Sequence, residues 1–559
     1  MQHFIDKLEQ TRAQESTNAI ERLYIGMRHL FNRGYYKPMG ASGETLREAM
    51  LILRPEIYGT INEDKVELNG LLYVLERLPE GIEECRYVHL TSEEGYKNSH
   101  FPVVIPKKRR RNCYRVDKDQ MNIEITRGRS EIYDILTHLT FMYMESDKIR
   151  ERIQEDDDDC YRRDWKKIIS LREKQNLTEK EQDIAIAHLA NILGRSFNSV
   201  KKVYFKFGTL ENPDRLIDVI YGLGIGSINE ENDNLKREIT FSPVLRERIG
   251  HHIHSAFWAY QIKKRIHQLN LFERPIHIIS SNMHSVMNRL FAEEALRKKF
   301  PDKDEMDFYV LLSNKANDNY RNEVKSYALK NGMISLEDNS SSHIDVQLFD
   351  TAKIQHLSTY ETNDAPLLLV MDYAFGEQAY EAMDELLKPF KAPNETLFYM
   401  NVESVSIMGK AGILEGGKGD IMIPTAHILE GTAGNYPFKN ELSISDFKNT
   451  DIDCYEGSMI TVLGTSLQNK DLLKFFHDST WSVIGLEMEG AHYQKAIQAA
   501  SKIRGSVTEN IKVRYAYYAS DNPLETGSTL ASGGLGTSGV KPTYTITRKI
   551  INQILNENT

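Results

Sequence analysis

The sequence predicts an α/β protein in which a mostly helical N-terminal domain precedes an α/β domain. The second domain is expected to hold a central, mostly parallel mixed sheet flanked by helices. Three observations lead to this expectation. A chain of 559 residues is too long for one hydrophobic core. Helical patterns dominate up to about residue 240, whereas from about residue 274 short apolar runs alternate with helical patterns. The polar stretch 229–234 separates the helical pattern from the alternating pattern, so we expect domains 1–240 and 241–559.

Composition narrows the class of protein. Asp+Glu 80 against Lys+Arg 70 gives a formal net charge of -10, which argues against a protein that coats nucleic acid. The sequence contains no run of about eighteen apolar residues and begins with a polar segment, so we expect no membrane span, no signal peptide and a cytoplasmic location. The cysteines are scattered without metal-ligand spacing, which favours reduced thiols and predicts neither a metal site nor a cofactor.

The N-terminal half reads as helices with few chemical signals. Helices are expected over 1–34 and 44–53, and the segment 66–78 is apolar enough to be buried. The basic run Lys107–Arg111 is either a phosphate, nucleotide or nucleic-acid contact or a solvated turn, and the turn is favoured because short basic runs are common. The run Glu155–Asp159 lacks the glycine of an EF-hand loop and is expected to be a solvated loop.

Two further segments of this half also have two interpretations. Thr178–Phe205 predicts a helical hairpin that resembles a helix-turn-helix, but any hairpin of helices gives this pattern, so DNA binding is disfavoured. The glycines of 222–226 do not follow a strand and are interpreted as the end of a linker. A regulatory or oligomer-building role is expected for this half.

The C-terminal half alternates between apolar runs and helical patterns. The runs 276–281, 308–312, 344–349 and 366–372 are expected to be strands, with 396–402 and 406–408 as parts of one further strand. Helices are expected over 285–299 and 378–387. Gly409 to Gly412 follows 406–408, and we interpret it as a strand end where the backbone approaches a ligand or as a tight turn.

Carboxylates follow two strands of this half. Glu487 and Glu489 lie between a strand at 481–484 and a helix at 491–502. Asp521 follows the strand at 513–519. Ligands of open α/β sheets bind at the carboxyl ends of strands, and a glutamate at a helix N-terminus can accept hydrogen bonds from a polyol. The sequence therefore predicts a polyol-binding site at these strand ends.

The motifs of this half, taken in order, resemble the nucleoside phosphorylase and nucleosidase superfamily over roughly residues 274–556. They are Gly-x-Ala-Gly at 409–412, Gly-Asp-Ile-x-Ile-Pro at 419–424, Glu-Met-Glu-Gly-Ala at 487–491 and Ser-Asp-x-Pro-Leu at 520–524. The last is most similar to the AMP nucleosidase branch, and the third is closer to methylthioadenosine/S-adenosylhomocysteine nucleosidases. The resemblance implies a phosphorylase-like fold and a homo-oligomer.

The resemblance also implies roles for individual residues. Asp521 would give a proton or hydrogen bond to N7 of a leaving purine, and Ser520 would position it. Glu489 would bind the ribose hydroxyls and Met488 would pack against the sugar. Glu487 matches the first glutamate of its motif and is grouped with the substrate-binding residues.

The nucleophile is where the sequence departs from the superfamily. The turn Ser280–Ser285 lacks the Gly-Asp pair and the arginine of phosphorylases, and Ile407 and Lys410 stand where an arginine and a serine are expected. Water is therefore favoured over phosphate. The nucleosidases' usual acidic base is also absent, and His284 either replaces it or is an ordinary histidine at a helix start.

The remaining candidate substrate contacts are Asn282, Gly409 and Lys410, and Lys410 suits a 5′-phosphate. The sequence thus predicts a purine nucleoside or nucleotide N-glycosidase. The alternatives are a purine nucleoside phosphorylase with an atypical phosphate site, which makes phosphate a second partner, and a nucleotide-sensing protein without turnover. The expected partners are a small purine nucleoside or nucleotide and further copies of the chain, with no membrane and no nucleic acid.

Overall fold

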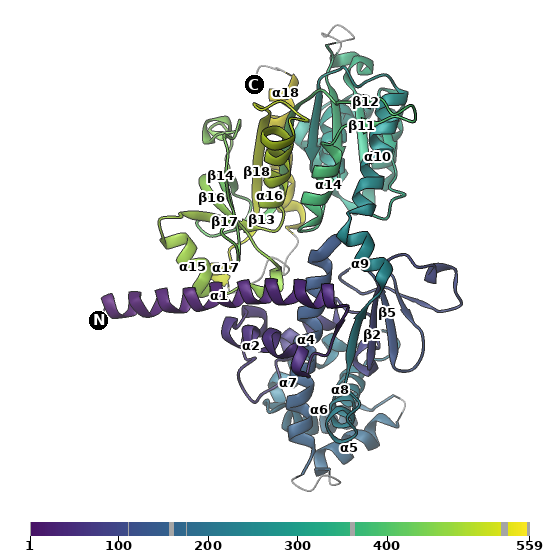
Figure 1. Ribbon diagram of the computed structural model, residues 1–559, viewed down its shortest axis with the longest axis vertical. Coiled ribbons are helices and arrows are strands. Elements are labelled where there is room, and N and C mark those ends of the chain that lie inside the picture. The colour runs from purple at the N-terminus through teal and green to yellow at the C-terminus, as the bar shows by residue number, and fades with distance from the viewer. Residues whose placement is uncertain are drawn as a thin grey trace. The chain divides into compact units, whose positions relative to one another are not determined.

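The computed structural model describes residues 2–109, 111–155, 161–174, 176–357, 364–526 and 535–555, with side chains from residue 12 onward. The chain forms two compact units that both combine helices and strands (Figure 1). Unit 1 comprises Met1–Thr126, Glu131–His251 and Ser466–Asn469, and unit 2 comprises Arg127–Ser130, His252–Thr465 and Lys470–Thr559. None of the helices in these ranges has the length and apolar character needed to cross a membrane.

Unit 1 contains a sheet as well as the expected helices. Its described strands run in the order β1-β6-β2-β5-β4-β3. The strands are β1 (Tyr35–Tyr36), β2 (Tyr87–Thr91), β3 (Val103–Val104), β4 (Cys113–Arg115), β5 (Gln120–Glu124) and β6 (Glu238–Phe241). The helices are α1 (Gln2–Arg33), α2 (Glu44–Leu53), α3 (Leu68–Leu75), α4 (Gly128–Ile153), α5 (Arg163–Arg172), α6 (Glu179–Leu193), α7 (Phe197–Phe207), α8 (Arg215–Asn232) and α9 (Pro243–Gly250).

The glycines of 222–226 are not a linker end, because they lie inside α8. A Cβ on Gly224 would lie 2.8 Å from the ring of Trp165, so this glycine permits close packing of the helix. The expected hairpin at 178–205 is present as α6 and α7, and Thr178 forms the capping box of α6 with Glu181.

The basic run points partly inward rather than into solvent. Arg111 lies 3.2 Å from Glu131, and both side chains are buried. Arg109 lies 3.2 Å from Asp134, which is also buried. Two of the five basic side chains are therefore paired within the unit, whereas Lys107 and Lys108 are exposed and Arg110 lies outside the described residues. Of the acidic run 155–159, residues 156–159 lie outside the described part of the chain.

Unit 2 is built on a mixed sheet, so the α/β class is confirmed. The strand order is β15-β14-β16-β17-β13-β7-β10-β9-β8, and β18 pairs with both β13 and β14. The sheet strands are β7 (Ile276–Ser280), β8 (Met333–Leu336), β9 (Val346–Asp350), β10 (Leu367–Met371), β13 (Val402–Ile413), β14 (Ile421–Leu429), β15 (Asn435–Pro437), β16 (Cys454–Thr461), β17 (Val483–Glu487) and β18 (Lys512–Asp521). A separate pair is formed by β11 (Phe390–Lys391) and β12 (Leu397–Phe398).

The sheet mixes parallel and antiparallel pairs, and β13 with β17 and β14 with β18 are antiparallel pairs near its centre. Strand β7 pairs in parallel with β10 and β13, and β13 pairs in parallel with β18. Strands β8, β9 and β15 pair antiparallel with their neighbours. Because β18 also pairs with β14, the strands β13, β17, β16, β14 and β18 close into a ring. The sheet is therefore more mixed than the sequence predicted.

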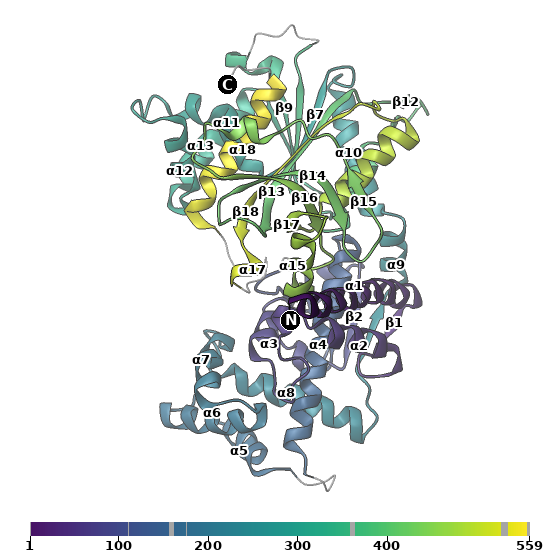
Figure 2. The same cartoon turned by 90° about the vertical axis from the view of Figure 1, so that its left-hand side faces the viewer.

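Helices cover both faces of this sheet. The helices are α10 (Ile253–Gln268), α11 (Met283–Leu296), α12 (Glu305–Ser313), α13 (Asp318–Lys330), α14 (Gln378–Leu386), α15 (Lys470–Asp478), α16 (Gly490–Gln498), α17 (Pro523–Thr526) and α18 (Val540–Leu555). Side chains of α10, α14 and α16 share one core with Leu367, Leu369 and Met371, whereas those of α11, α12, α13 and α18 share another with Leu368 and Val370 (Figures 1 and 2). This alternation along β10 is the period of two expected for a strand covered on both faces.

Two expectations for unit 2 were wrong. Residues 308–312 form part of helix α12, because Asp304 caps the helix in a capping box with Asp307 and the buried side chains recur at helical spacing. Gly409 to Gly412 lies within β13 rather than in a turn at its end. The strand continues because β18 pairs alongside it, with an irregularity between Ala411 and Gly412.

Candidate functional site

A cavity of about 290 Å³ lies at the strand ends of unit 2. Ser280 ends β7, Tyr373 follows β10 and Glu487 ends β17, and all three line the cavity. The adjacent strands β13 and β18 continue past the end of β7 and form a wall that includes Gly409 and Lys410. This position is the carboxyl edge of the parallel strands, where ligands of such sheets bind.

Glu487 is buried and fully engaged by the protein. The Thr461 hydroxyl donates to its Oε1, and the backbone N–H groups of Glu489 and Gly490 donate to its Oε2. Thr461 Oγ1 in turn accepts from the N–H of Ala491 at 2.9 Å. Burial raises the pKa of Glu487 to about 7, although these hydrogen bonds oppose the rise. Glu487 therefore anchors the first turn of α16, as a capping side chain does.

Glu489 is the more available of the two carboxylates. Its Oε1 accepts from the N–H of Gly376 at 2.9 Å, and the backbone of Met488 provides a second hydrogen bond to the carboxylate. Burial raises the pKa of Glu489 to about 8, and the charge of Glu487 adds to the rise. A carboxylate has about four acceptor sites, so Glu489 can still accept from a ligand in the cavity, which Met488 also lines.

Gly490 allows the two glutamates to sit this close to the core. A Cβ there would lie 2.4 Å from Nε2 and Cδ2 of His427 and 2.7 Å from Oε1 of Glu487. The His427 ring is buried, is stacked against Phe438 and lies 3.3 Å from the hydroxyl of Tyr517. Because this ring has little room to move, the position requires glycine.

Four tyrosines were missed as site residues by sequence reasoning: Tyr373, Tyr493, Tyr517 and Tyr518 line the cavity. Tyr493 lies one helical turn after Glu489, and its hydroxyl is 3.0 Å from Ser280 Oγ. Its helical spacing from Glu489 was a usable signal, as was the strand-end position of Tyr373. Aromatic faces with hydroxyl tips are suited to a ligand that is both apolar and hydrogen-bonding.

A second cavity, of about 500 Å³, adjoins the first. Lys410 and Tyr518 line both cavities. Asn282 and His284 line only the second, and Asn282 accepts from the N–H of His284 at 3.0 Å and so caps α11. Desolvation and the nearby charge of Arg321 lower the pKa of His284, which favours a neutral ring that can accept a proton.

Asp521 and Ser520 line neither cavity. Asp521 is three residues beyond Tyr518 on β18, beside Gly412 of β13. Ser520 donates to Asp521 Oδ1 at 2.6 Å, whereas the buried Oδ2 has no hydrogen-bond partner among the described residues. Burial raises the pKa of Asp521 above its usual range, and the Ser520 hydrogen bond and the charges of Lys410 and Lys418 oppose part of this rise.

The predicted residues thus fall into three adjacent groups. Glu487, Met488, Glu489, Gly409 and Lys410 share the first cavity, and Asn282, His284 and Lys410 share the second. Ser520 and Asp521 form a buried pair next in line along β18. Lys410 connects the groups because it lines both cavities and acts electrostatically on Asp521.

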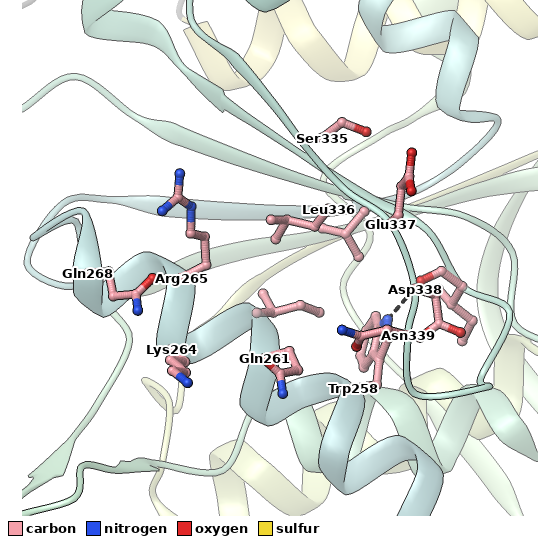
Figure 3. Close-up of a pocket in the computed structure, with 13 residues that line it drawn as sticks. Trp258, Gln261, Lys264, Arg265, Gln268, Ser335, Leu336, Glu337, Asp338 and Asn339 are labelled. Atoms are coloured by element: carbon pink, nitrogen blue, oxygen red, sulfur yellow. Dashed lines mark hydrogen bonds between the residues drawn. The ribbon is translucent and has the colours of Figure 1, made fainter.

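A third cavity, of about 350 Å³, contains none of the predicted residues. It lies between α10 and the segment that ends β8, and Figure 3 shows Lys264 and Arg265 on its helix side and Glu337 on its strand side. Trp258 donates its indole N–H to the carbonyl of Ile344 at 2.8 Å. Charged groups of both signs around a structural tryptophan do not indicate a particular ligand.

Half of the chain is similar to solved structures of nucleosidases and a phosphorylase. The nucleosidase for 5′-methylthioadenosine and S-adenosylhomocysteine from Campylobacter jejuni is 11% identical, with 50% of this chain and 99% of that chain covered and a TM-score of 0.30. A futalosine hydrolase mutant of Helicobacter pylori strain 26695 is also 11% identical, with 50% of this chain and 98% of that chain covered and a TM-score of 0.30. Uridine phosphorylase of Schistosoma mansoni is 9% identical, with 50% of this chain and 87% of that chain covered and a TM-score of 0.30.

No curated protein matches the sequence. A protein-family model does match, over residues 44–299 and 295–556, and its description is a family of unknown function. The two matches together span more than half of the chain, in both units. The chain belongs to this family of unknown function, DUF6909.

Proposed function

We propose that unit 2 is a purine nucleoside or nucleotide N-glycosidase that transfers the sugar to water. The observation that carries this proposal is that the two glutamates differ in their hydrogen bonds to the protein. Glu487 accepts from three donors within the protein, whereas Glu489 accepts from two backbone groups and lines the cavity with acceptor capacity left for a ligand. A carboxylate in that position can accept hydrogen bonds from the hydroxyls of a ribose.

The cavity also suits the transition state of glycoside cleavage. Breaking the C1′–N bond leaves positive charge on the sugar, and a preorganised carboxylate beside it stabilises that charge. Glu489 supplies this charge when it is ionised, above its pKa of about 8, and the faces of Tyr493 and Tyr517 surround it with a largely apolar wall. In this proposal the sugar lies in the first cavity with its hydroxyls towards Glu489.

The leaving purine requires a proton as its bond to C1′ breaks. Asp521 is the proposed donor, because its buried Oδ2 lacks a partner and its raised pKa favours the protonated form. Ser520, which donates to Oδ1, directs the proton to Oδ2 and thus towards the base. The purine would then extend from the sugar along β18 towards Asp521.

The nucleophile in this proposal is a water molecule. His284, held neutral, takes a proton from that water as its oxygen bonds to C1′, while the electron pair of the broken bond stays with the purine. A second candidate function is phosphorolysis. It is favoured by one observation, namely that Lys410 and Lys315 bring positive charge to the cavity next to the proposed sugar site.

Release of free base tests the proposal. The full chain would be incubated with AMP, adenosine, inosine, guanosine and methylthioadenosine, each with and without phosphate, and the products separated by chromatography. Free base without phosphate, lost in Asp521→Asn but kept in the exposed control Asp451→Asn, is the expected result. Release only with phosphate would establish the phosphorylase. No release from any substrate would refute both for this panel.

A further inference from the structure

We propose that the helices α5, α6 and α7 of unit 1 bind duplex DNA, with α7 in the major groove. This activity is separate from the chemistry proposed for unit 2. The sequence pattern of the α6–α7 hairpin does not distinguish a DNA-binding pair of helices from any other pair. Three features of the structure do so together: the turn between the helices, the exposed face of α7 and the local charge.

The turn between α6 and α7 is short and is fixed at both ends. It consists of Gly194, Arg195 and Ser196. Gly194 ends α6 in the left-handed conformation, with a φ of 63°, and Ser196 begins α7 by accepting from the N–H of Ser199 at 3.3 Å. Arg195 donates to the carbonyl of Val66 at 2.7 Å, which ties the turn to the rest of unit 1. A three-residue turn with a glycine is typical of the helix-turn-helix motif.

Helix α7 buries one face and leaves the other open. Figures 1 and 2 show α5, α6 and α7 as neighbouring helices, and α7 packs against α6, α3 and α8. Successive residues of a helix are rotated by about 100°, so the direction opposite the buried face falls on Asn198, Lys202 and Phe205. All three side chains are exposed and project away from the core of unit 1. The buried residues of α7 are Val200, Val203, Tyr204 and Phe207.

The composition of this open face suits contact with base pairs. Asn198 lies in the first turn of α7, the part of a recognition helix that contacts base edges, and an asparagine amide can pair with adenine. The ring of Phe205 is 55% exposed and suits apolar contact with a thymine methyl group. The major groove of B-DNA is about 12 Å wide and admits an α-helix, whereas side chains cannot read the narrow major groove of double-stranded RNA. The face therefore favours duplex DNA.

The three helices carry a positive charge that the rest of the chain lacks. Residues 162–207 contain 11 Lys and Arg but 5 Asp and Glu, a formal charge of +6 in a chain whose net charge is -10. Two of the acidic side chains on α6 are paired, Glu181 with Lys174 and Asp183 with Lys201. Such a local excess of positive charge attracts the phosphates of DNA. Exposed basic side chains without an ion pair in the described part of the chain include Arg163, Lys166, Lys167, Lys202 and Lys206.

Fluorescence anisotropy on the full chain tests this inference. Labelled duplex DNA of about 30 base pairs and random sequence would be titrated at about 50 to 200 mM salt, beside double-stranded RNA and single-stranded DNA of the same length. The test variant combines Lys202→Ala and Lys206→Ala, and the control combines Lys298→Ala and Lys330→Ala, two exposed lysines of unit 2. We expect the test variant to bind duplex DNA at least about tenfold more weakly and to lose about 2 from the magnitude of the salt slope, because each lysine contacts a phosphate. The control should bind as wild type does.

The reading role of α7 is tested by selection from a pool of random duplexes. Asn198→Ala should keep the wild-type affinity for random-sequence DNA within about twofold but enrich a different sequence, since a base contact is lost and the phosphate contacts remain. The altered side chains are all exposed, so each variant should keep the wild-type Tm.

Four results would overturn the inference. They are equal losses in the test and control variants, tighter binding of either RNA or single-stranded DNA than of duplex DNA, no binding of duplex DNA at the lowest salt, and an unchanged enriched sequence in Asn198→Ala. Base release by unit 2 is measured separately and bears on none of these outcomes.

Discussion

Replacing Gly490 by alanine is expected to destabilise unit 2 and to displace both site glutamates. The new Cβ would lie 2.4 Å from two ring atoms of His427 and 2.7 Å from Oε1 of Glu487. The ring is confined by Phe438 and Tyr517, so neither partner can move without further rearrangement. The substitution therefore tests whether the close approach at the start of α16 is real.

The expected magnitude follows from overpacking and helix propensity. A clash with a confined ring costs about 3 kcal/mol. Alanine recovers about 1 kcal/mol because it replaces glycine in a helix. The net loss of about 2 kcal/mol corresponds to a fall in Tm of about 3 °C for a unit of about 300 residues.

The assay is thermal and urea unfolding of the full chain, with Gly464→Ala as the matched control. A Cβ at Gly464 meets no atom within 4 Å, so that variant should be unchanged or slightly more stable. We also expect Gly490→Ala to weaken nucleoside binding, since the Glu487 and Glu489 carboxylates move. A Gly490→Ala variant as stable as the control, with unaltered binding, would refute this account of the turn.

Three further changes have defined outcomes. The affinity for a nucleoside, measured by calorimetry, should rise between pH 6 and 9 because Glu489 ionises with a pKa of about 8. The Glu489→Gln variant should show little dependence of affinity on pH, and a wild-type affinity that does not change with pH would contradict this role. The pKa of Glu487 is about 7 in the folded protein against an ordinary 4.5, so this group contributes its full stabilisation at low pH and loses it as the carboxyl ionises. In urea unfolding, the free energy of unfolding of wild type should fall by about 3 kcal/mol relative to that of Glu487→Gln between pH 4 and 8. A difference between the two proteins that stays constant with pH would contradict this. Arg111→Met removes the buried cation that pairs with Glu131 and should cost about 3 kcal/mol. The exposed control Lys201→Met should cost under about 1 kcal/mol, and similar losses of the two variants in chemical unfolding would refute a buried pair.

Local patterns were enough to predict much of unit 2. The unbroken apolar run around Leu367–Met371 predicted a central strand, because a strand covered on both faces needs no polar alternation. The strand-to-helix change around Glu487 and Glu489 placed two carboxylates at a strand end, and the structure puts both at a cavity. These features depend on neighbouring residues in the sequence.

Features that depend on distant residues were not predictable in this way. Phe308–Leu312 has the composition of a strand, and its capping box and its packing against α18 make it a helix. From the sequence alone, Gly224 is expected to interrupt a helix, whereas in the structure it lies inside α8 and leaves room for the ring of Trp165. Lys315 carries no local signal, because its significance arises only when α12 and α13 bring it to the cavity that Lys410 also lines.

The most direct test of the proposed site is a single-turnover experiment that separates binding from bond cleavage. Excess protein would be mixed with whichever substrate of the panel wild type cleaves, and base release and affinity would be measured for wild type, Asp521→Asn and Glu489→Gln. The account predicts that Asp521→Asn binds the ligand with nearly wild-type affinity but releases base at least about 100-fold more slowly, since a proton donor is lost. Glu489→Gln should bind more weakly. Base release by Asp521→Asn at the wild-type rate, or none by wild type, would contradict it.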